Sequence, residues 1–494
     1  MQKNVLSVIL LMTLLASCAV GCGESAPTGD DQTSESTTGA ETVSVESLVG
    51  FPMEDNGGEV FTVLADSNKP YDFNAEEASG DVVNDAVYEK LSNVEEYLGI
   101  TIETQFEPCG WQERGAFNSL FINAVTAGDS TYDLVVSPIV CTMPTAVEGY
   151  FIEGSGLTSC DFSHPWWIDN MYENYSVAGK LYGFLGDFTL ATYKDMTVIY
   201  FNQRIWNEYS AENPYDLVRS GKWTFDKMAE LTVGMASDLN GDGAWTTDDD
   251  QLAYLFDQVP NGTFQTSFDL DVLMNNGDGM PEYLGLTEKF AAAHEKMAAY
   301  ISHEGIVGMT NADKYPNDLV TLFGQNNVAA MVGFLYNTEY LRDMTDDYGI
   351  VPMPKYDEQQ KDYITQLGTS TLMAFVPKLA SSADLTSKVL ELCGYYSQEL
   401  VVPKYYEVAL KDKYARDTDI PEMLDIIRNG AMIDFLFVYG TSLENVPFTH
   451  FRFGGKSTPR AQTIKSSVAS EFAKNEKSFM ASVEKLYEAY VSLE

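Results

Sequence analysis

Basic side chains are scarce in this sequence. Its 494 residues include 30 Lys and Arg against 73 Asp and Glu, which gives a formal net charge of −43. Nucleic acids and anionic membrane surfaces are held by basic faces, so this balance argues against both as partners. Histidine is rarer still, and the four His residues form no HExxH motif of a zinc protease.

The usual signatures of enzymes are also missing. The sequence has no GxSxG elbow of a serine hydrolase. Gly455-Lys456-Ser457 imitates the end of a P-loop, but His450 stands where that motif needs its first glycine. The many carboxylates leave room for a glycosidase pair, yet no pattern singles one out. We therefore expect no catalytic activity and no catalytic residues.

The only long apolar run lies at the start of the chain. Residues 1–17 read as a signal peptide, with Lys3 in the basic region and an apolar stretch over 5–16 that is too short for a transmembrane helix. The segment ends in Leu-Ala-Ser-Cys18, which resembles a bacterial lipobox, so we expect lipidation at Cys18. A second candidate ending at Cys22 fits less well, because an alanine stands where a larger aliphatic residue belongs. Cleavage without a lipid is the alternative.

A tether is predicted over residues 18–45. Its central part is small, polar and acidic without a large apolar residue, which is typical of a flexible linker. Some 20 residues of this kind reach roughly 25 Å. We therefore expect an extracellular protein whose body stands just off the outer face of the cell membrane.

Cysteine is sparse beyond this anchor region. Four residues remain, and they allow three pairings among which the sequence does not choose: Cys109, Cys141, Cys160 and Cys393. A bridge between Cys141 and Cys160 is possible outside the cell. Free buried thiols are the other interpretation.

The first part of the folded chain alternates strands and helices. Apolar or alternating runs predict strands at 61–65, 100–106 and 132–137, and helical spacing between them predicts two helices that end at Gly99 and Gly128. This order implies a mostly parallel sheet with right-handed crossovers. Ligands bind beyond the carboxyl ends of such strands, here at 107–111 and 137–142.

Residues 179–202 connect this unit to a second one. Two short β-runs, at 181–184 and 197–201, predict a crossing between lobes, that is, a hinge with a cleft beside it. Beyond the crossing we expect further strands at 327–334, 348–353 and 371–376. Helices are expected at 224–232, 286–301, 383–396, 420–427 and 466–493. We find no internal repeat.

Several motifs together carry a family resemblance. Besides the lipobox and tether, they are HPWWIDN (164–170), GKLYGFLGD (179–187), FNQRIWNEY (201–209), PYDLVRSGKWTFDKM (214–228), DLNGDGAWTTDDDQ (238–251), VAAMVGF (328–334) and LKDKYARDTDIPEMLDII (410–427). With these motifs the chain resembles the family 1 extracellular solute-binding proteins of bacterial ABC importers. It is most similar to lipoproteins of Gram-positive anaerobes that are assigned to sugars, and the resemblance covers essentially the whole mature chain.

The resemblance implies an α/β fold of the two-lobed periplasmic-binding-protein type (type II), with mixed sheets flanked by helices and hinge crossings between the lobes. We expect a first lobe at 46–190 plus 349–400 and a second, helix-rich lobe at 191–348 plus 401–494. The chain should re-enter the first lobe near Tyr348, as VPMP implies. We expect a monomer that hands its solute to ABC permease subunits.

Residues 238–249 match a 12-residue calcium loop. Oxygen-bearing side chains fall at the ligand positions, a glycine occupies the sharp turn, and the backbone carbonyl of one residue completes the set: Asp238, Asn240, Asp242, Ala244, Thr246 and Asp249. The last position is Asp rather than Glu, as in dockerin-type loops. We expect a structural Ca²⁺ here; the alternative is an acidic turn stabilised by Asx hydrogen bonds.

Aromatic and polar residues at strand ends and loops indicate a sugar site. Sugars stack their C–H faces on Trp or Tyr and need amide, hydroxyl and carboxylate partners for their hydroxyls. The candidates are Trp111, Ser137, Trp166, Tyr182, Asp187, Tyr336, Asn337 and Thr369. The alternative is that these aromatics belong to the core and that HPWW braces the first lobe.

These observations predict a lipid-anchored solute-binding subunit of an ABC importer that closes on a carbohydrate or oligosaccharide. A surface receptor that feeds a sensor system is the second hypothesis, and a surface glycoside hydrolase the third. The identity of the sugar does not follow from the sequence.

Overall fold

A computed structural model describes residues 44–73, 78–246, 248–257, 262–275, 279–309, 317–407, 417–449 and 468–493. Residues Val45–Glu494 belong to one compact unit, which holds nearly all described residues. The predicted signal peptide, Cys18 and almost all of the tether lie outside the described residues. Within the ranges given, no helix has the length and apolar character needed to cross a membrane.

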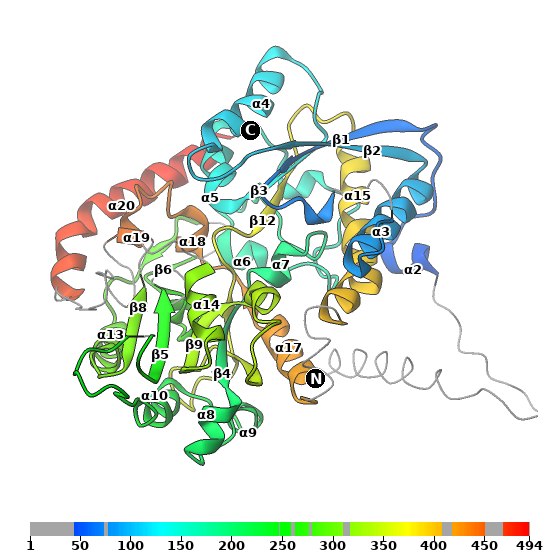
Figure 1. The fold of residues 1–494 in the computed structure, drawn as a ribbon. Coiled ribbons are helices and arrows are strands. Elements are labelled where there is room, and N and C mark those ends of the chain that lie inside the picture. Colours follow the sequence, from blue (N-terminus) through cyan, green and yellow to red (C-terminus); the bar gives the residue numbers. More distant parts are fainter. Residues whose placement is uncertain are drawn as a thin grey trace, which may run out of the picture. The chain divides into compact units, whose positions relative to one another are not determined.

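The first sheet has four strands in the order β12-β3-β1-β2 (Figure 1). β1 (Glu59–Asp66), β2 (Ile100–Glu107) and β3 (Leu134–Pro138) are parallel, which confirms the predicted β-α-β-α-β unit. β12 (Leu372–Phe375) joins the edge antiparallel to β3, although it follows some 230 residues later in the chain. This sheet and its helices form the first lobe.

Helices α3 (Val82–Leu98) and α4 (Arg114–Ala127) connect the parallel strands. α3 begins at Asp81, whose side chain accepts hydrogen bonds from the backbone of Val83 and Asn84. Both helices end at a left-handed glycine, Gly99 (φ 58°) and Gly128 (φ 80°), as predicted. A side chain at Gly99 would also meet the backbone of Asp55 at 2.8 Å, so only glycine fits there.

The second sheet is mixed and has five strands in the order β10-β4-β9-β5-β8. β5 (Leu252–Asp257) is parallel to β8 (Ile306–Met309) and to β9 (Val328–Phe334), whereas β4 (Thr197–Asn202) runs antiparallel to β9. Every residue of β4, β5 and β9 is buried, because helices cover both faces of the sheet. This sheet and its helices form the second lobe.

The prediction that the chain re-enters the first lobe near Tyr348 is wrong. β10 (Tyr348–Pro352) pairs antiparallel with β4, with Tyr348 opposite Asn202, so it belongs to the second sheet. The chain returns later, through β11 (Thr365–Gln366), to β12. The apolar run at β10 identifies a buried strand but carries no information on which sheet it joins. The β-run expected at 181–184 is also not a strand; it forms a single bridge from Phe184 to Ala374.

Two crossings between the lobes lie side by side. Met196, at the end of the first crossing, forms an antiparallel bridge with Leu367 in the second. The backbone N–H of Gly368 donates to the carbonyl of Asp195 at 3.0 Å, and the Thr197 hydroxyl donates to the carbonyl of Gln366 at 2.9 Å. β11 in turn pairs with β13 (Ala431–Met432). The crossing predicted at 179–202 is therefore one half of a paired hinge.

The remaining described elements complete the two lobes. The C-terminal helix α20 (Val468–Ser492) contacts the turn η2 (Met143–Glu148) in the first lobe and α13 (Glu288–Ile301) in the second (Figure 1). The other elements are α2 (Val45–Val49), η1 (Pro70–Asp72), α5 (Ile139–Thr142), η3 (Gly154–Gly156), α6 (Met171–Tyr175), α7 (Ala191–Lys194), α8 (Gln203–Glu208), α9 (Pro214–Arg219), α10 (Phe225–Val233), α12 (Phe264–Ser267), β6 (Leu273–Met274), β7 (Glu282–Tyr283), α14 (Asn317–Gly324), η5 (Leu335–Tyr340), α15 (Ala383–Tyr396), η6 (Ser397–Val401), α17 (Ile420–Asn429), α18 (Phe435–Tyr439) and α19 (Val446–Thr449).

Candidate functional site

The carboxyl ends of β1, β2 and β3 share one edge of the first sheet, because the three strands are parallel. The amino end of the antiparallel β12 reaches the same edge, where the backbone N–H of Ile139 donates to the carbonyl of Thr371 at 3.1 Å. The backbone N–H of Val140 donates to the carbonyl of Thr369 at 3.3 Å, which places this predicted ligand residue, half-buried, at the edge.

Asp66 joins the ends of β1 and β2. Its buried carboxylate accepts hydrogen bonds from the backbone N–H of Cys109 at 2.9 Å and of Asn68 at 3.0 Å. The turn that follows β2 is thereby held against the end of β1. This turn carries Trp111.

Trp111 is an exposed aromatic platform at this edge. Its side chain is 44% exposed, although large apolar side chains usually lie in the core. The guanidinium of Arg114 lies 3.8 Å from the centre of the ring and donates a hydrogen bond to the Trp111 carbonyl. The guanidinium thus lies over the indole ring, and much of the Trp111 side chain stays exposed.

A second aromatic group follows β9 in the second lobe. The ring of Tyr336 stacks on Phe334 with centroids 5.7 Å apart and planes at 18°, and Tyr340 meets Tyr336 edge-on at 6.5 Å. Tyr336 is half-buried, while Tyr340 is 55% exposed. Tyr340 was not among the predicted residues, because a single Tyr in a polar turn differs little from an ordinary surface residue.

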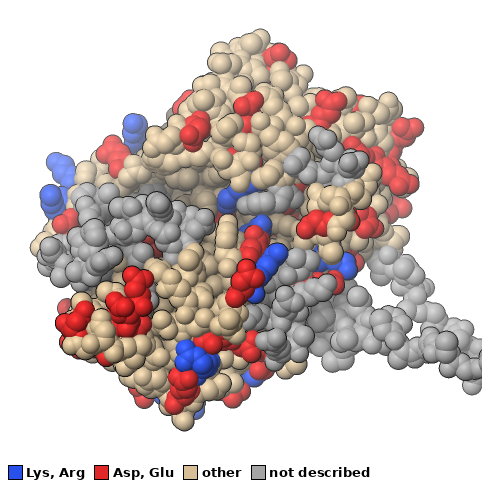
Figure 2. Space-filling model, viewed as in Figure 1, with Lys and Arg blue, Asp and Glu red and all other residues tan. Residues whose placement is uncertain are grey.

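Charged side chains form ion pairs at the two crossings. The ammonium of Lys69, from the loop after β1, lies 2.6 Å from Asp195 in the first crossing and donates to the carbonyl of Ser370 in the second at 2.8 Å. Lys194 pairs with Glu339 of η5 at 2.9 Å. Figure 2 shows basic and acidic side chains next to one another where this face of the molecule is hollowed. The sequence pattern did not single out these residues, because the pairs join segments far apart in the chain.

Four other predicted ligand residues lie inside the protein. The Ser137 hydroxyl donates to Thr142, Tyr182 packs edge-on against Tyr490, and Trp166 lies between His164 and Tyr395. The carboxylate of Asp187 accepts hydrogen bonds from Arg428, Tyr193 and Gln398, and its burial raises the pKa of the carboxyl. All four are buried and packed or hydrogen-bonded within the protein in this structure, and ligand contact at these positions stays a prediction.

Asn337 has a local structural role. Its buried side-chain oxygen accepts a hydrogen bond from the backbone N–H of Phe334 at 2.8 Å and so closes the turn that carries Tyr336. Of the eight predicted residues, the structure therefore places Trp111, Tyr336 and Thr369 where their surfaces are at least partly open.

The HPWW motif braces the first lobe. The indole N–H of Trp167 donates to Glu391 of α15 at 2.9 Å, and the His164 ring hydrogen-bonds the other oxygen of the same carboxylate. Glu391 is fully buried, and its burial raises the pKa of the carboxyl. This arrangement corresponds to the structural alternative for the motif.

The predicted calcium loop is an exposed turn closed by its own side chains. Asp238 accepts hydrogen bonds from the backbone N–H groups of Gly241 and Gly243, and Asp242 accepts one from Ala244 at 2.7 Å. Both glycines have positive φ, at 72° and 76°. The buried carboxylate of Asp250 accepts from Leu239 and Thr246.

In the described part of the chain, no three His, Cys, Asp or Glu side chains are arranged to hold a metal ion. The hydrogen bonds around Asn240 and Asp242 match the Asx-turn alternative for this loop. Ca²⁺ at Asp238–Asp249 therefore stays a prediction.

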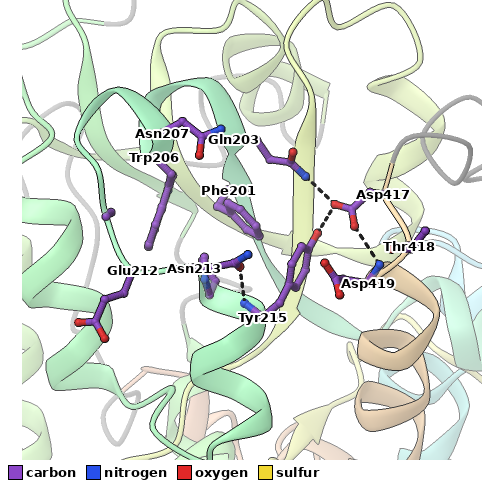
Figure 3. Close-up of a pocket in the computed structure, with 12 residues that line it drawn as sticks. Phe201, Gln203, Trp206, Asn207, Glu212, Asn213, Tyr215, Asp417, Thr418 and Asp419 are labelled. Atoms are coloured by element: carbon purple, nitrogen blue, oxygen red, sulfur yellow. Dashed lines mark hydrogen bonds between the residues drawn. The ribbon is translucent and has the colours of Figure 1, made fainter.

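A separate cavity of about 230 Å³ lies at the far end of β4, where Asn202 pairs with Tyr348 (Figure 3). Asp417 accepts hydrogen bonds there from Gln203 at 2.5 Å and from the Tyr215 hydroxyl at 2.6 Å. The aromatic rings in its wall are buried, and the cavity lies away from the end of β4 that meets the hinge. The strand-end edge with Trp111 is the better candidate for a ligand site.

Comparison with known proteins extends this picture. No protein-family model matches the chain, and no curated protein matches it. Among solved structures it is similar to an ABC transporter solute-binding protein from Thermotoga lettingae bound with α-D-tagatose, at 14% identity and a TM-score of 0.50 over 87% of this chain and 100% of that one.

Two further structures agree. An ABC substrate-binding protein from Listeria monocytogenes in complex with cycloalternan matches at 12% identity and a TM-score of 0.50, over 88% of this chain and 100% of that one. Maltose-bound MalE3 of T. maritima matches at 12% identity and a TM-score of 0.50, over 87% and 99%. At these identities the likeness establishes the fold. The chain has a two-lobed α/β fold of the periplasmic-binding-protein type, with mixed sheets, flanking helices and crossings between the lobes.

Proposed function

We propose that this chain is the solute-binding subunit of an ABC importer and captures a carbohydrate between its two lobes. The observation that carries the proposal is Trp111, an exposed indole stacked on Arg114 at the carboxyl edge of the first sheet. Ligands of open α/β sheets bind at this edge.

The chemistry of the edge suits a sugar. An aromatic plane takes up the C–H face of a pyranose, and charged or polar side chains bind its hydroxyls. Trp111 and the pair Tyr336–Tyr340 supply aromatic surface from the two lobes, and Lys69 and Asp195 supply polar groups between them. The proteins of the same fold named above were solved with tagatose, cycloalternan and maltose.

Closure would follow from the paired crossings. Residues 187–197 and 365–371 bridge at Met196 and Leu367, so the two segments bend together. A ligand that contacts both lobes binds the closed state better than the open one and shifts the protein toward it. Lys69 is hydrogen-bonded to both crossings, so its contacts would change as the hinge bends.

The rest of the proposal rests on the sequence. Cys18 would carry the lipid, the tether over 18–45 would hold the body outside the cell, and the closed protein would deliver its sugar to permease subunits as a monomer. No catalytic step is involved. The loop Asp238–Asp249 would hold Ca²⁺ as a structural ion.

A ligand screen tests this function. Thermal shift with a panel from monosaccharides to linear and cyclic oligosaccharides, followed by calorimetric titration of the hits, should reveal a sugar that binds wild type and no longer binds Trp111→Ala. Tyr209→Ala is the matched control, because Tyr209 is an exposed aromatic at the carboxyl end of α8. Release of new reducing ends would instead support the hydrolase, and absence of any sugar ligand would overturn the proposal.

A further inference from the structure

Two of the cysteines meet at the edge that carries Trp111. Cys109 follows β2 and Cys141 lies in α5 after β3, so they are 32 positions apart and are separated within the sheet by β1. The Cys141 thiol donates a hydrogen bond to the backbone carbonyl of Cys109 at 3.3 Å.

The backbones of both cysteines are held in place. The N–H of Cys109 donates to Asp66 at 2.9 Å, and the carbonyl of Cys141 accepts from the buried Asn118 side chain at 3.0 Å. Both cysteines are buried, at 1% and 3% exposure. The contact between the two cysteines is therefore part of the packed interior.

The two thiols differ in acidity. Interaction with the Cys109 thiol lowers the pKa of Cys141, while interaction with the Cys141 thiol, together with burial, raises the pKa of Cys109. The thiolate is the nucleophile in thiol–disulfide exchange, so Cys141 is the attacking residue and Cys109 the resolving one.

We propose that Cys109 and Cys141 form a disulfide bond when the protein meets a low-molecular-weight disulfide as oxidant. During a local opening of the chain that exposes it, the Cys141 sulfur, buried in the folded state, attacks the oxidant, forms a mixed disulfide and releases the first small thiol. The Cys109 sulfur then attacks the Cys141 sulfur and releases the second. Two protein thiols are oxidised and one oxidant disulfide is reduced to two thiols, so protons and electrons balance.

The other two cysteines of the described chain have different surroundings. Cys160 donates to the carbonyl of Ser387 at 3.4 Å, and burial raises the pKa of its thiol. Burial also raises the pKa of Cys393, to about 11. Both stay thiols under the same conditions, and the bridge between Cys141 and Cys160 that the sequence left open is replaced by Cys109–Cys141.

The bond would fix one wall of the ligand edge. Trp111 lies two residues after Cys109, so a covalent link from Cys109 to α5 ties the turn of Trp111 to the neighbouring strand end. Closing this loop restricts the unfolded chain, and we expect the melting temperature to rise by about 2–4 °C on oxidation.

The test uses the full mature chain in glutathione redox buffers. After oxidation, denaturation and alkylation, non-reducing peptide mapping should show the peptide with Cys109 joined to the peptide with Cys141, and alkylated Cys160 and Cys393. Cys109→Ser and Cys141→Ser should each abolish the cross-link and the rise in melting temperature, whereas Cys393→Ser should keep both.

Complete alkylation of Cys109 and Cys141 after oxidation would overturn the proposal, as would a cross-link to Cys160 or Cys393. Should a serine variant fail to fold, the mapping of wild type alone still decides, because it compares the four cysteines of the described chain within one molecule.

Discussion

Oδ1 of Asp187 lies 2.9 Å from Nη2 of Arg428 and so joins the first crossing to α17, 241 positions later in the chain. The second carboxylate oxygen accepts hydrogen bonds from Tyr193 at 3.0 Å and Gln398 at 2.8 Å. Asp187 is fully buried and Arg428 is only 16% exposed. This carboxylate therefore anchors the hinge from within the protein.

Replacing Asp187 with Asn should destabilise the protein, because it leaves a mostly buried guanidinium without its counter-charge. We expect a loss of about 3–5 kcal/mol in the free energy of unfolding, measured by urea denaturation. Asp216→Asn is the matched control: it removes a 73% exposed partner of Arg219 and should cost less than about 1 kcal/mol. Equally small losses in both variants would contradict the anchoring role.

Asp434 should make stability depend on pH. It caps α18, where its Oδ1 accepts from the Leu436 N–H at 2.8 Å, and burial together with the nearby Asp271 raises its pKa to about 7. Between about pH 4 and pH 7 the folded protein keeps a proton here that the unfolded chain has lost. The stabilisation of the folded state by this bound proton is present at low pH and is lost as the pH rises through about 7.

Asp434→Asn keeps the capping oxygen but cannot titrate. Between pH 4 and pH 8 its melting temperature should fall less than that of wild type. The difference corresponds to roughly 1–4 kcal/mol in the free energy of unfolding. Asp81→Asn, which replaces the carboxylate at the exposed N-cap of α3, is the matched control. Parallel curves for wild type and Asp434→Asn would refute the assignment.

Replacing Trp111 or Tyr336 should lower the affinity for the ligand and change the stability of the fold little. Truncating an aromatic contact at the centre of a site costs on the order of 2–4 kcal/mol, or roughly 30- to 1,000-fold in affinity. Trp111→Ala and Tyr336→Ala should show this loss in calorimetric titration while melting within a few degrees of wild type. Unchanged affinity in either variant would assign that residue to packing.

Calcium should bind the loop Asp238–Asp249 and stabilise the folded state by mass action. Millimolar Ca²⁺ should raise the melting temperature of wild type, and chelation should reverse the rise. Asp242→Asn keeps an acceptor for the Ala244 N–H but removes one charge, so its response should be smaller. Equal responses of both proteins would remove the calcium assignment.

Lipidation should depend on Cys18. In a bacterial expression host, Cys18→Ala should be released from membranes into the medium, because we expect a single lipidated residue to hold the protein. Fractionation and immunoblotting measure the change. Membrane retention of Cys18→Ala together with release of Cys22→Ala would move the anchor to the second site.

The sequence by itself determined the local elements of this fold. The parallel unit β1-α3-β2-α4-β3 and the glycine ends of its two main helices agree with the prediction, because apolar periodicity and left-handed caps are properties of neighbouring residues. The exposed Trp111 was also found, since it directly follows a strand of that unit.

Only the tertiary structure decided which distant segments meet. β10 pairs in the second sheet, Trp166 and Asp187 are buried, and Cys109 lies against Cys141. None of these outcomes follows from the local sequence pattern. The physical reason is that a strand, an aromatic ring or a carboxylate looks the same in sequence whether its partner is a neighbour or lies 200 residues away. The hydrogen bonds and packing of the folded chain determine which segments pair. At the hinge they join Asp187 to Arg428 and Lys69 to Asp195.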